Sequence, residues 1–335
     1  MLSTKTKVIA LSSVAVLFTA CERPPIETTQ TGYRGTAMVD VANPRLPAAE
    51  TGYPAALPPA PSAGPKAGDV YENVQVLGDL SVAEFTRLMT AITAWVSPEQ
   101  GCNYCHNPAN LASDDVYTKV VSRRMIQMTQ HINENWSDHV GDNGVNCYTC
   151  HAGNNVPEYI WFSAGDSASG NKHFVGWRDG QNMPDVGVGY TSLPSDTYTT
   201  FLKDPVGNQS IRLEDDTFSS PELGLSIKDA EYTYGLMTNW SQALGVNCTY
   251  CHNSRNFASW EQSPPTRAIA HHGLGMVRDL NANYLIPLKP EYPDNRLGPH
   301  EGDAPKAYCA TCHQGVNKPL GGADAVSDYP SLAGR

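Results

Sequence analysis

One five-residue pattern, Cys-x-x-Cys-His, occurs four times in this chain of 335 residues. Two cysteines at this spacing can add their sulfurs to the vinyl groups of a haem, and the next histidine then lies beneath the iron as its proximal ligand. Redox cysteine pairs and zinc sites share the cysteine spacing but need no histidine directly after it. The four copies predict four c-type haems, with thioether cysteines Cys102, Cys105, Cys147, Cys150, Cys248, Cys251, Cys309 and Cys312 and proximal ligands His106, His151, His252 and His313.

The cysteine count and the charge narrow the class of protein further. Of nine cysteines, eight belong to the four boxes and the ninth is Cys21, so none remains for a structural disulfide. The haems would then be the covalent cross-links of the fold. A net charge of -11 disfavours nucleic acid as a ligand and favours a basic soluble partner, whose encounter would be faster at low salt.

The N-terminal region resembles a bacterial export signal. Lys5 and Lys7 precede an apolar stretch, residues 8–20, that is too short to span a bilayer comfortably. The sequence Leu-Phe-Thr-Ala-Cys ending at Cys21 resembles a lipobox, which predicts a signal peptide over residues 1–20 and lipidation of Cys21. An uncleaved anchor is the alternative. Residues 21–75 are rich in proline and predict an extended arm outside the cytoplasm.

Helical patterns precede three of the four boxes. Ser81, with Glu84 three residues later, has the pattern of a capping box ahead of an apolar stripe that ends at Trp95. Further helices are expected over residues 117–136 and 227–244. We therefore expect a mainly α fold with extensive irregular loops. The segment 152–226, rich in Gly, Asp, Ser and Thr, is expected to be a long surface connection with a short hairpin near 198–213.

The third and fourth boxes repeat the first and second. Residues 102–113 match residues 248–259, and the stretch 128–136 aligns with the stretch 276–284. This repeat predicts two pseudo-symmetric two-haem modules, residues 76–151 (haems 1 and 2) and residues 227–320 (haems 3 and 4), followed by a C-terminal tail, residues 321–335.

A haem that only carries electrons needs a sixth ligand from the protein. Met89 and Met237 lie at corresponding positions in the helices before the first and third boxes, which makes them candidates despite the usual packing role of helical methionines. Met125 and Met128 compete for the second haem. In the repeat, Met125 aligns with Gly273, which cannot ligate iron.

The fourth haem therefore needs a ligand from elsewhere in the chain. His271 and His272 precede the fourth box and compete with His139 for this position. Local patterns leave the choice open.

The whole set of motifs resembles the tetrahaem cytochrome c subunit of purple-bacterial photosynthetic reaction centres. The most specific likenesses are the lipobox-like Cys21 and the segments 28–35, 89–98, 123–125, 267–270 and 276–285. The resemblance implies the following axial pairs: Met89 with His106, Met125 with His151, Met237 with His252, and His139 with His313. Met128 and Met276 would then be packing residues.

The resemblance also implies a function and a location. Such a subunit is lipid-anchored on the periplasmic face of the photosynthetic membrane and re-reduces the photo-oxidised bacteriochlorophyll special pair held by L-type and M-type core subunits. Its electron donor is a soluble c-type cytochrome or a high-potential iron-sulfur protein. A multihaem periplasmic reductase is the alternative, but it requires an iron with an open sixth position. A freely diffusing shuttle cytochrome fits the anchor and the arm less well.

Overall fold

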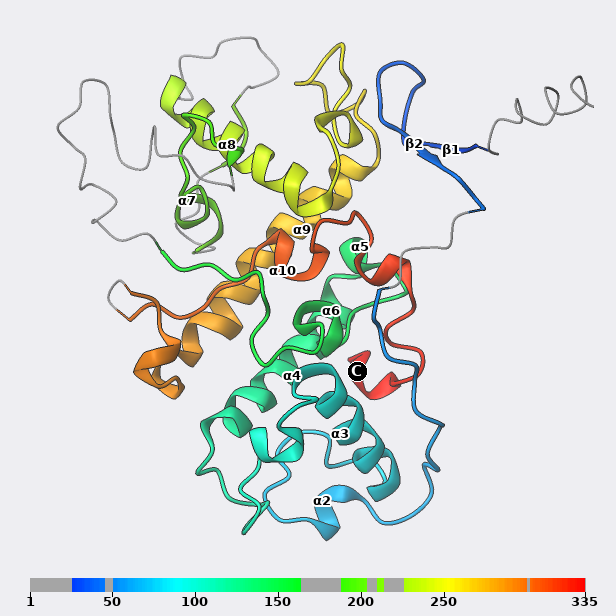
Figure 1. Ribbon diagram of the computed structural model, residues 1–335, viewed down its shortest axis with the longest axis vertical. Coiled ribbons are helices and arrows are strands. Elements are labelled where there is room, and N and C mark those ends of the chain that lie inside the picture. Colours follow the sequence, from blue (N-terminus) through cyan, green and yellow to red (C-terminus); the bar gives the residue numbers. More distant parts are fainter. Residues whose placement is uncertain are drawn as a thin grey trace, which may run out of the picture.

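The computed structural model describes residues 26–45, 51–163, 188–203, 210–213, 226–299 and 302–334. Helices and irregular segments dominate these ranges, and the paired strands within them form one two-stranded sheet (Figure 1). The expectation of a mainly α protein with extensive loops is confirmed. The expected signal peptide and Cys21 lie outside the described residues. Among the described ranges we find no helix with the length and apolar composition that a bilayer crossing requires.

Four long helices organise the chain: α3 (Val82–Val96), α4 (Tyr117–Asn135), α8 (Ile227–Leu244) and α9 (Thr266–Leu280). The first begins as expected, because the Ser81 hydroxyl accepts from the Glu84 amide at 3.1 Å and the Glu84 carboxylate accepts from the Ser81 amide at 3.0 Å. The expected bounds of α4 and α8 agree with the structure to within one residue.

Shorter elements connect these helices and carry the cysteine boxes. In chain order they are β1 (Glu27–Gln30), β2 (Val39–Ala42), α2 (Ala67–Val70), η1 (Gly101–Tyr104), α5 (Ser137–Val140), α6 (Cys147–His151), α7 (Tyr198–Leu202), η5 (Cys248–Tyr250), the π-helical η6 (Asn281–Leu285), η7 (Ile286–Glu291), η8 (Asp294–Arg296), α10 (Cys309–His313), η9 (Pro319–Gly322) and η10 (Pro330–Leu332).

The elements are stacked along the long axis of the molecule. Helices α2 and α3 lie at one end, α6 and α10 lie side by side near the middle, and α8 lies towards the other end (Figure 1). Helices α4 and α9 meet at the centre, where Ile132 and Leu280 are buried in one apolar cluster. Helices α3 and α8, which precede the first and third boxes, thus lie on opposite sides of the pair α6 and α10, which carry the second and fourth boxes (Figure 1).

The proline-rich arm is extended only in part. Its first described residues form the antiparallel hairpin β1–β2, in which Glu27 pairs with Ala42. The hairpin is attached beside the third box, where the Met38 amide donates to the Thr249 carbonyl oxygen at 3.0 Å. The stretch 51–66 then packs alongside α3. The Arg87 side chain of this helix donates to the Leu57 carbonyl oxygen at 2.6 Å.

The C-terminal tail packs into the apolar core that contains α3. Leu332 is fully buried, and the Tyr329 ring packs edge-on against the Trp95 indole with the ring centroids 4.9 Å apart. The Asn133 amide donates to the Leu332 carbonyl oxygen at 2.7 Å, which attaches the tail to α4. Residues 321–334 therefore return to the end of the molecule where α3 lies.

The expected hairpin near residues 198–213 is wrong. Residues 198–202 form helix α7, whose Phe201 and Leu202 are each 1% exposed and pack in a cluster with Leu236 and Leu274. The Asp196 carboxylate accepts from the Thr199 amide at 3.0 Å, which favours a helical start. The described parts of the connection therefore contribute to the apolar core between α8 and α9 and are more than a surface link.

Candidate functional site

The four box histidines share one hydrogen-bond arrangement. In each, the Nδ1 atom lies 2.9 to 3.1 Å from a backbone carbonyl oxygen that follows the box, so Nδ1–H donates and Nε2 is left with a free lone pair. A hydrogen-bonded Nδ1 also fixes the orientation of a ligating ring. The pairs are His106 with Leu111, His151 with Asn154, His252 with Phe257 and His313 with Val316.

These imidazoles are also held neutral where they are buried. Burial lowers the pKa of His313 to about 4, and burial also lowers the pKa values of His151 and His252. A neutral imidazole with a free Nε2 is the form that binds iron. The donor set therefore fits a c-type haem at each box.

The boxes adopt two local structures that alternate along the chain. The first and third boxes begin as the 3-10 turns η1 and η5, each followed by an isolated bridge between two asparagines, Asn107 with Asn110 and Asn253 with Asn256. The second and fourth boxes are the short helices α6 and α10. Each of these ends at a left-handed residue, Ala152 with φ 47° or Gln314 with φ 50°.

This local structure brings the two sulfurs of each box together. Residues three apart lie on the same side of a helical turn, so both cysteines of a box can reach one edge of a porphyrin. The histidine continues the same turn.

The candidate methionine ligands occupy different environments. Met89 in α3 and Met237 in α8 are partly buried at the edges of two core clusters. Met276 is buried with Ile132 and Leu280 in the cluster between α4 and α9, and Met128 packs against the same cluster. The packing role implied for Met128 and Met276 agrees with this contact. Met125 is partly buried in α4 and lies outside that cluster.

His139 lies in α5, opposite the histidine of the fourth box. Its ring centroid is 6.0 Å from that of His313, with the ring planes at 67°. Two imidazoles bound to one metal ion at the usual distance of about 2 Å would have centroids about 6 Å apart. The Nδ1 atom of His139 lies 2.9 Å from the Ile269 carbonyl oxygen, which again leaves Nε2 free. The competing His271 and His272 are both exposed.

Gly273 provides the space that His139 fills. A Cβ atom at Gly273 would lie 2.5 Å from Cε1 of His139 and 3.0 Å from its Nε2. This glycine stands where the first repeat has Met125. The histidine thus occupies the place that the equivalent methionine side chain would need.

The second and fourth boxes are direct neighbours. The thiol groups of Cys150 and Cys312 lie within hydrogen-bond distance of each other, and the Gln314 side-chain amide approaches the Cys150 carbonyl oxygen at 3.5 Å. Helix α3 contacts both η1 of the first box and α6 of the second, and α8, which leads into the third box, contacts α10 of the fourth. The spatial order of the boxes is therefore first, second, fourth, third.

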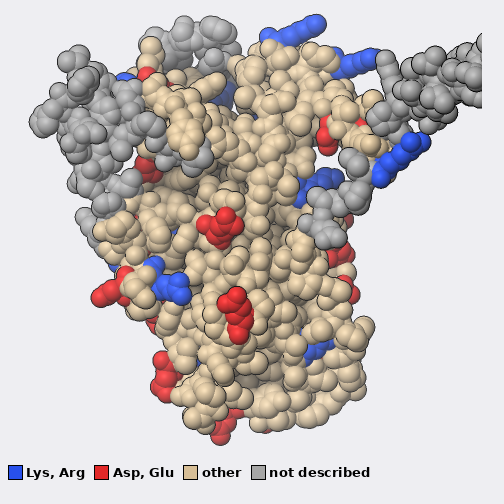
Figure 2. Space-filling model, viewed as in Figure 1, with Lys and Arg blue, Asp and Glu red and all other residues tan. Residues whose placement is uncertain are grey.

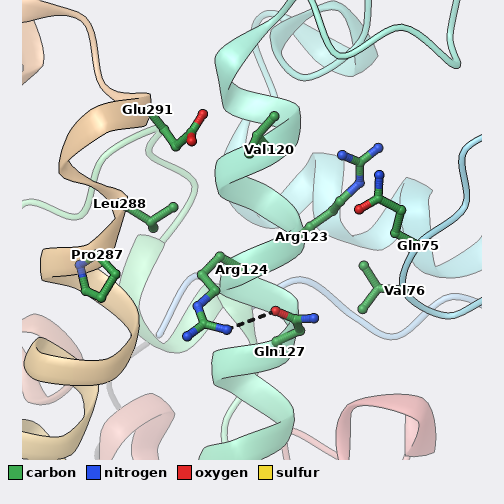
Figure 3. A pocket seen from close by; sticks show the side chains of 9 residues that line it. All are labelled: Gln75, Val76, Val120, Arg123, Arg124, Gln127, Pro287, Leu288 and Glu291. Atoms are coloured by element: carbon green, nitrogen blue, oxygen red, sulfur yellow. Dashed lines mark hydrogen bonds between the residues drawn. The ribbon is translucent and has the colours of Figure 1, made fainter.

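A separate pocket of about 310 Å³ lies between α4 and η7 (Figure 3). Its two guanidinium groups are already engaged: Arg123 donates to the Asp114 carboxylate at 2.7 Å and Arg124 donates to the Gln127 side chain at 3.3 Å. No axial candidate and no box residue is among the residues that line it, which are Gln75, Val76, Val120, Arg123, Arg124, Gln127, Pro287, Leu288 and Glu291. This pocket is not a haem site.

Two cationic side chains near the boxes were missed by sequence reasoning. Lys119 donates to the Leu111 carbonyl oxygen at 2.8 Å, and Arg267 approaches the Phe257 carbonyl oxygen at 3.4 Å. The same two oxygens accept from the histidines of the first and third boxes. The alignment of the two repeats, which pairs Lys119 with Arg267, could have identified both residues from the sequence.

A mainly helical scaffold in which each pair of cysteines is followed by an imidazole with a fixed orientation is typical of a c-type cytochrome. The comparisons place it more narrowly. The family described as "Photosynthetic reaction centre cytochrome C subunit" matches residues 22–333, and the chain belongs to that family. It is therefore an electron-transfer subunit rather than an enzyme, it binds c-type haem, and it associates with the reaction-centre core and hence with the membrane.

Three relatives carry the same description, photosynthetic reaction center cytochrome c subunit. The protein of Rubrivivax gelatinosus is 51% identical, with 96% of this chain and 87% of the relative covered. The protein of Thermochromatium tepidum is 49% identical over 97% of this chain and 79% of its own length. The protein of Roseobacter denitrificans is 44% identical over 97% and 90%. The matches span nearly the whole chain, so they include all four boxes.

Proposed function

We propose that this chain carries four c-type haems and re-reduces the photo-oxidised special pair of the reaction centre. Electrons would enter from a soluble periplasmic carrier, either a small c-type cytochrome or a high-potential iron-sulfur protein. The observation that carries this proposal is that each box has an imidazole fixed through Nδ1, while α6 and α10 lie stacked between α3 and α8 (Figure 1). A linear row of haems is suited to moving electrons between two distant surfaces.

The proposed axial pairs are Met89 with His106, Met125 with His151, Met237 with His252 and His139 with His313. Each haem, when bound, supplies a one-electron iron couple. The chain's own residues hold the cysteine sulfurs on one face of a turn, fix each proximal ring and supply the second ligand. Since every iron would then carry two protein ligands, no position would be open to a substrate.

We also infer two pseudo-symmetric two-haem modules. Recurring contacts support this inference. The amide of Gly153, after the second box, donates to the Trp95 carbonyl oxygen at the end of α3 at 2.9 Å. The amide of Gly315, after the fourth box, donates to the Ala243 carbonyl oxygen at the end of α8, also at 2.9 Å. The two modules would meet where α6 contacts α10 and α4 contacts α9.

The end of the molecule near the third box is the proposed docking face for the L-type and M-type core subunits. Exposed apolar side chains gather there, including Val41 on β2, Phe257 and Trp260. The hairpin that carries Val41 begins at Glu27, six residues after Cys21. A lipid on Cys21 would therefore attach this same end to the periplasmic face of the membrane.

Flash-induced absorption spectroscopy on membranes that contain the protein tests the proposal. Bleaching of the special pair should be followed by oxidation of a haem α band with the kinetics of special-pair recovery. A redox titration of the same signal would show which haem reacts first. If light leaves all haems unchanged at potentials where the methionine-ligated haems are reduced, the proposed function is wrong.

A further inference from the structure

A buried lysine shares its hydrogen-bond acceptor with the proximal histidine of the first haem site. Lys119 is 7% exposed and lies in the first turn of α4. Its ammonium group donates to the carbonyl oxygens of Leu111 and Ser113, each at 2.8 Å. The Leu111 carbonyl oxygen also accepts from Nδ1 of His106 at 3.1 Å. One oxygen therefore contacts both a cation and the imidazole ring.

The second repeat has the same arrangement with a different cation. Arg267 donates to the Ser259 carbonyl oxygen at 2.8 Å and approaches the Phe257 carbonyl oxygen at 3.4 Å, and Phe257 accepts from Nδ1 of His252 at 2.9 Å. The repeat pairs Lys119 with Arg267. The charge recurs although the side chain differs, so the arrangement does not depend on one residue type.

The three charged side chains that contact one another beside Leu111, namely Lys119, Asp114 and Arg123, carry a net positive charge. The Asp114 carboxylate lies 3.4 Å from the Lys119 ammonium group and also binds the Arg123 guanidinium at 2.7 and 2.9 Å. The hydrogen bonds from Arg123 lower the pKa of Asp114 to about 2, so it is ionised at neutral pH. Two cations and one anion leave a net charge of +1.

We propose that Lys119 is a positioning residue that raises the reduction potential of the first haem through the shared Leu111 carbonyl. An oxygen that accepts from an ammonium group is a weaker acceptor for the imidazole N–H. The His106 ring then keeps its proton more fully and donates less charge to the iron, which favours the ferrous form. The nearby positive charge acts in the same direction, because the site is partly shielded from water. This inference rests on the proposed role of His106 as the proximal ligand.

Redox titrations of the haem α bands in the purified holoprotein test this inference. We expect Lys119→Met to shift the ferrous/ferric equilibrium of the first haem at least threefold towards the ferric form, and tenfold would correspond to 59 mV for a one-electron couple. The exposed variant Asp114→Asn removes the anion and should shift the same haem in the opposite direction. Lys119→Arg, which copies Arg267, should stay within twofold of wild type.

Opposite shifts in Lys119→Met and Asp114→Asn, confined to one haem, would support the inference. A general loosening of the site would instead move both variants in the same direction and weaken the near-infrared methionine–iron band. Shifts of the same sign, or no shift in either variant, overturn the inference. If Lys119→Met fails to incorporate haem, Lys119→Gln takes its place, since its amide can donate to the same oxygens without charge.

A separate variant keeps this result distinct from a failure of the ligand assignment. His106→Leu should lose the low-spin spectrum of one haem. If His106→Leu retains every low-spin haem of the wild type, the assignment of His106 as a ligand is wrong. That result would overturn the proposed ligand set itself, separately from the effect of Lys119.

Discussion

At the scale of single residues, the contact between Gly273 and His139 would explain how two similar repeats could hold the two different ligands that we propose. The repeat aligns Gly273 with Met125, and in the structure the glycine lies directly against the imidazole of His139. The imidazole of His139 therefore fits in this position only because residue 273 has no side chain. A change at either residue should affect the same iron.

Replacement of Gly273 by alanine tests this dependence. The new Cβ would lie 2.5 Å from Cε1 of His139, so the ring must leave the position that it holds opposite His313. We expect one haem to become high-spin or to bind carbon monoxide, with a stability loss of about 1–3 kcal/mol. Optical and electron paramagnetic resonance spectra of the purified protein provide the measurement.

Gly275→Ala in the same helix is the matched control. Its Cβ would lie 3.0 Å from the Trp136 ring, so it should cost similar packing energy without a change in spin state. A Gly273→Ala protein whose haems all remain low-spin would contradict the role of His139 as a ligand.

Met237 and Met276 provide a second pair of contrasting residues. In Met237→Leu, the third haem should lose its sixth ligand, become high-spin and titrate at a lower potential, since a thioether ligand favours ferrous iron. Met276→Leu should keep every haem low-spin and cost less than about 1.5 kcal/mol, because leucine conserves the volume of this packing residue. Identical spectra for the two variants would remove Met237 from the ligand set.

Sequence reasoning proposed the four box histidines as proximal ligands from the box pattern alone. It reached the choice of Met125 and His139 only through the resemblance, because local spacing left Met128, His271 and His272 in competition. Lys119 could not be found, since its role depends on a carbonyl oxygen eight residues earlier in the chain. A lone lysine at the start of a helix has the pattern of a solvated residue.

At the scale of elements, the position of Met89 depends on how α3 is held. The hydroxyl of Ser81 accepts from the Glu84 amide and donates to the Pro61 carbonyl oxygen at 2.7 Å, so one side chain caps the helix and attaches the arm. We expect Ser81→Ala to cost about 2 kcal/mol in the free energy of unfolding. Denaturant unfolding followed by circular dichroism is the measurement.

Thr86→Ala is the control, because the exposed Thr86 hydroxyl only bonds back to the Val82 carbonyl oxygen within α3. Its effect should stay within about 0.5 kcal/mol. Equal losses in the two variants would show that the capping box contributes nothing beyond helix propensity.

Helices α4 and α9 are joined by residues at equivalent positions of the two repeats. His131 in α4 lies 2.5 Å from the Asp279 carboxylate in α9, and the Trp136 indole donates to the same carboxylate at 2.9 Å. Burial alone would raise the pKa of Asp279, but hydrogen bonds from Asn283, His131 and Trp136 together lower it.

This lowered pKa predicts how stability depends on pH. Because the folded-state pKa of Asp279 lies below its unfolded value of about 3.9, its contribution is complete above that pH and is lost as pH falls through the folded-state pKa. Asp279→Asn should therefore destabilise the protein by about 1–3 kcal/mol at pH 7 and by less at pH 3. Unfolding curves at both pH values, with the exposed Asp142→Asn as the control, measure the difference. A penalty that grows towards pH 3 would contradict the assignment.

Elements with local signals were predictable, and elements that depend on tertiary burial were not. The capping box of α3 and the periodicity of α8 gave their bounds directly from the sequence. Helix α7 was mistaken for a hairpin because its short, Thr-rich sequence carries no helical period, and burial of Phe201 and Leu202 decides its structure. The tail around Leu332 was assigned to no module for the same reason.

At the scale of the whole molecule, the proposed order of the boxes would separate an entry surface for electrons from an exit surface. The third box lies at the end with the β1–β2 hairpin, and the first box lies at the opposite end, near α2 and α3 (Figure 1). On the face shown in Figure 2, Lys and Arg side chains gather mainly towards the hairpin end, whereas acidic side chains predominate on the lower half. An uneven charge distribution of this kind would orient a basic soluble donor towards the acidic end, which carries the first box.

The net charge of -11 makes the rate of donor encounter the property to measure. We expect the second-order rate constant for re-reduction by a basic soluble cytochrome c to fall about tenfold or more between low and high salt, because screening shortens the reach of the attraction from about 30 Å at 0.01 M to about 3 Å at 1 M. An acidic soluble cytochrome of similar potential is the matched partner, and its rate should rise over the same range as repulsion is screened. Stopped-flow measurements on the purified holoprotein distinguish the two trends. If the rate constants of both partners do not change with salt concentration, apolar contact rather than the acidic surface governs the encounter.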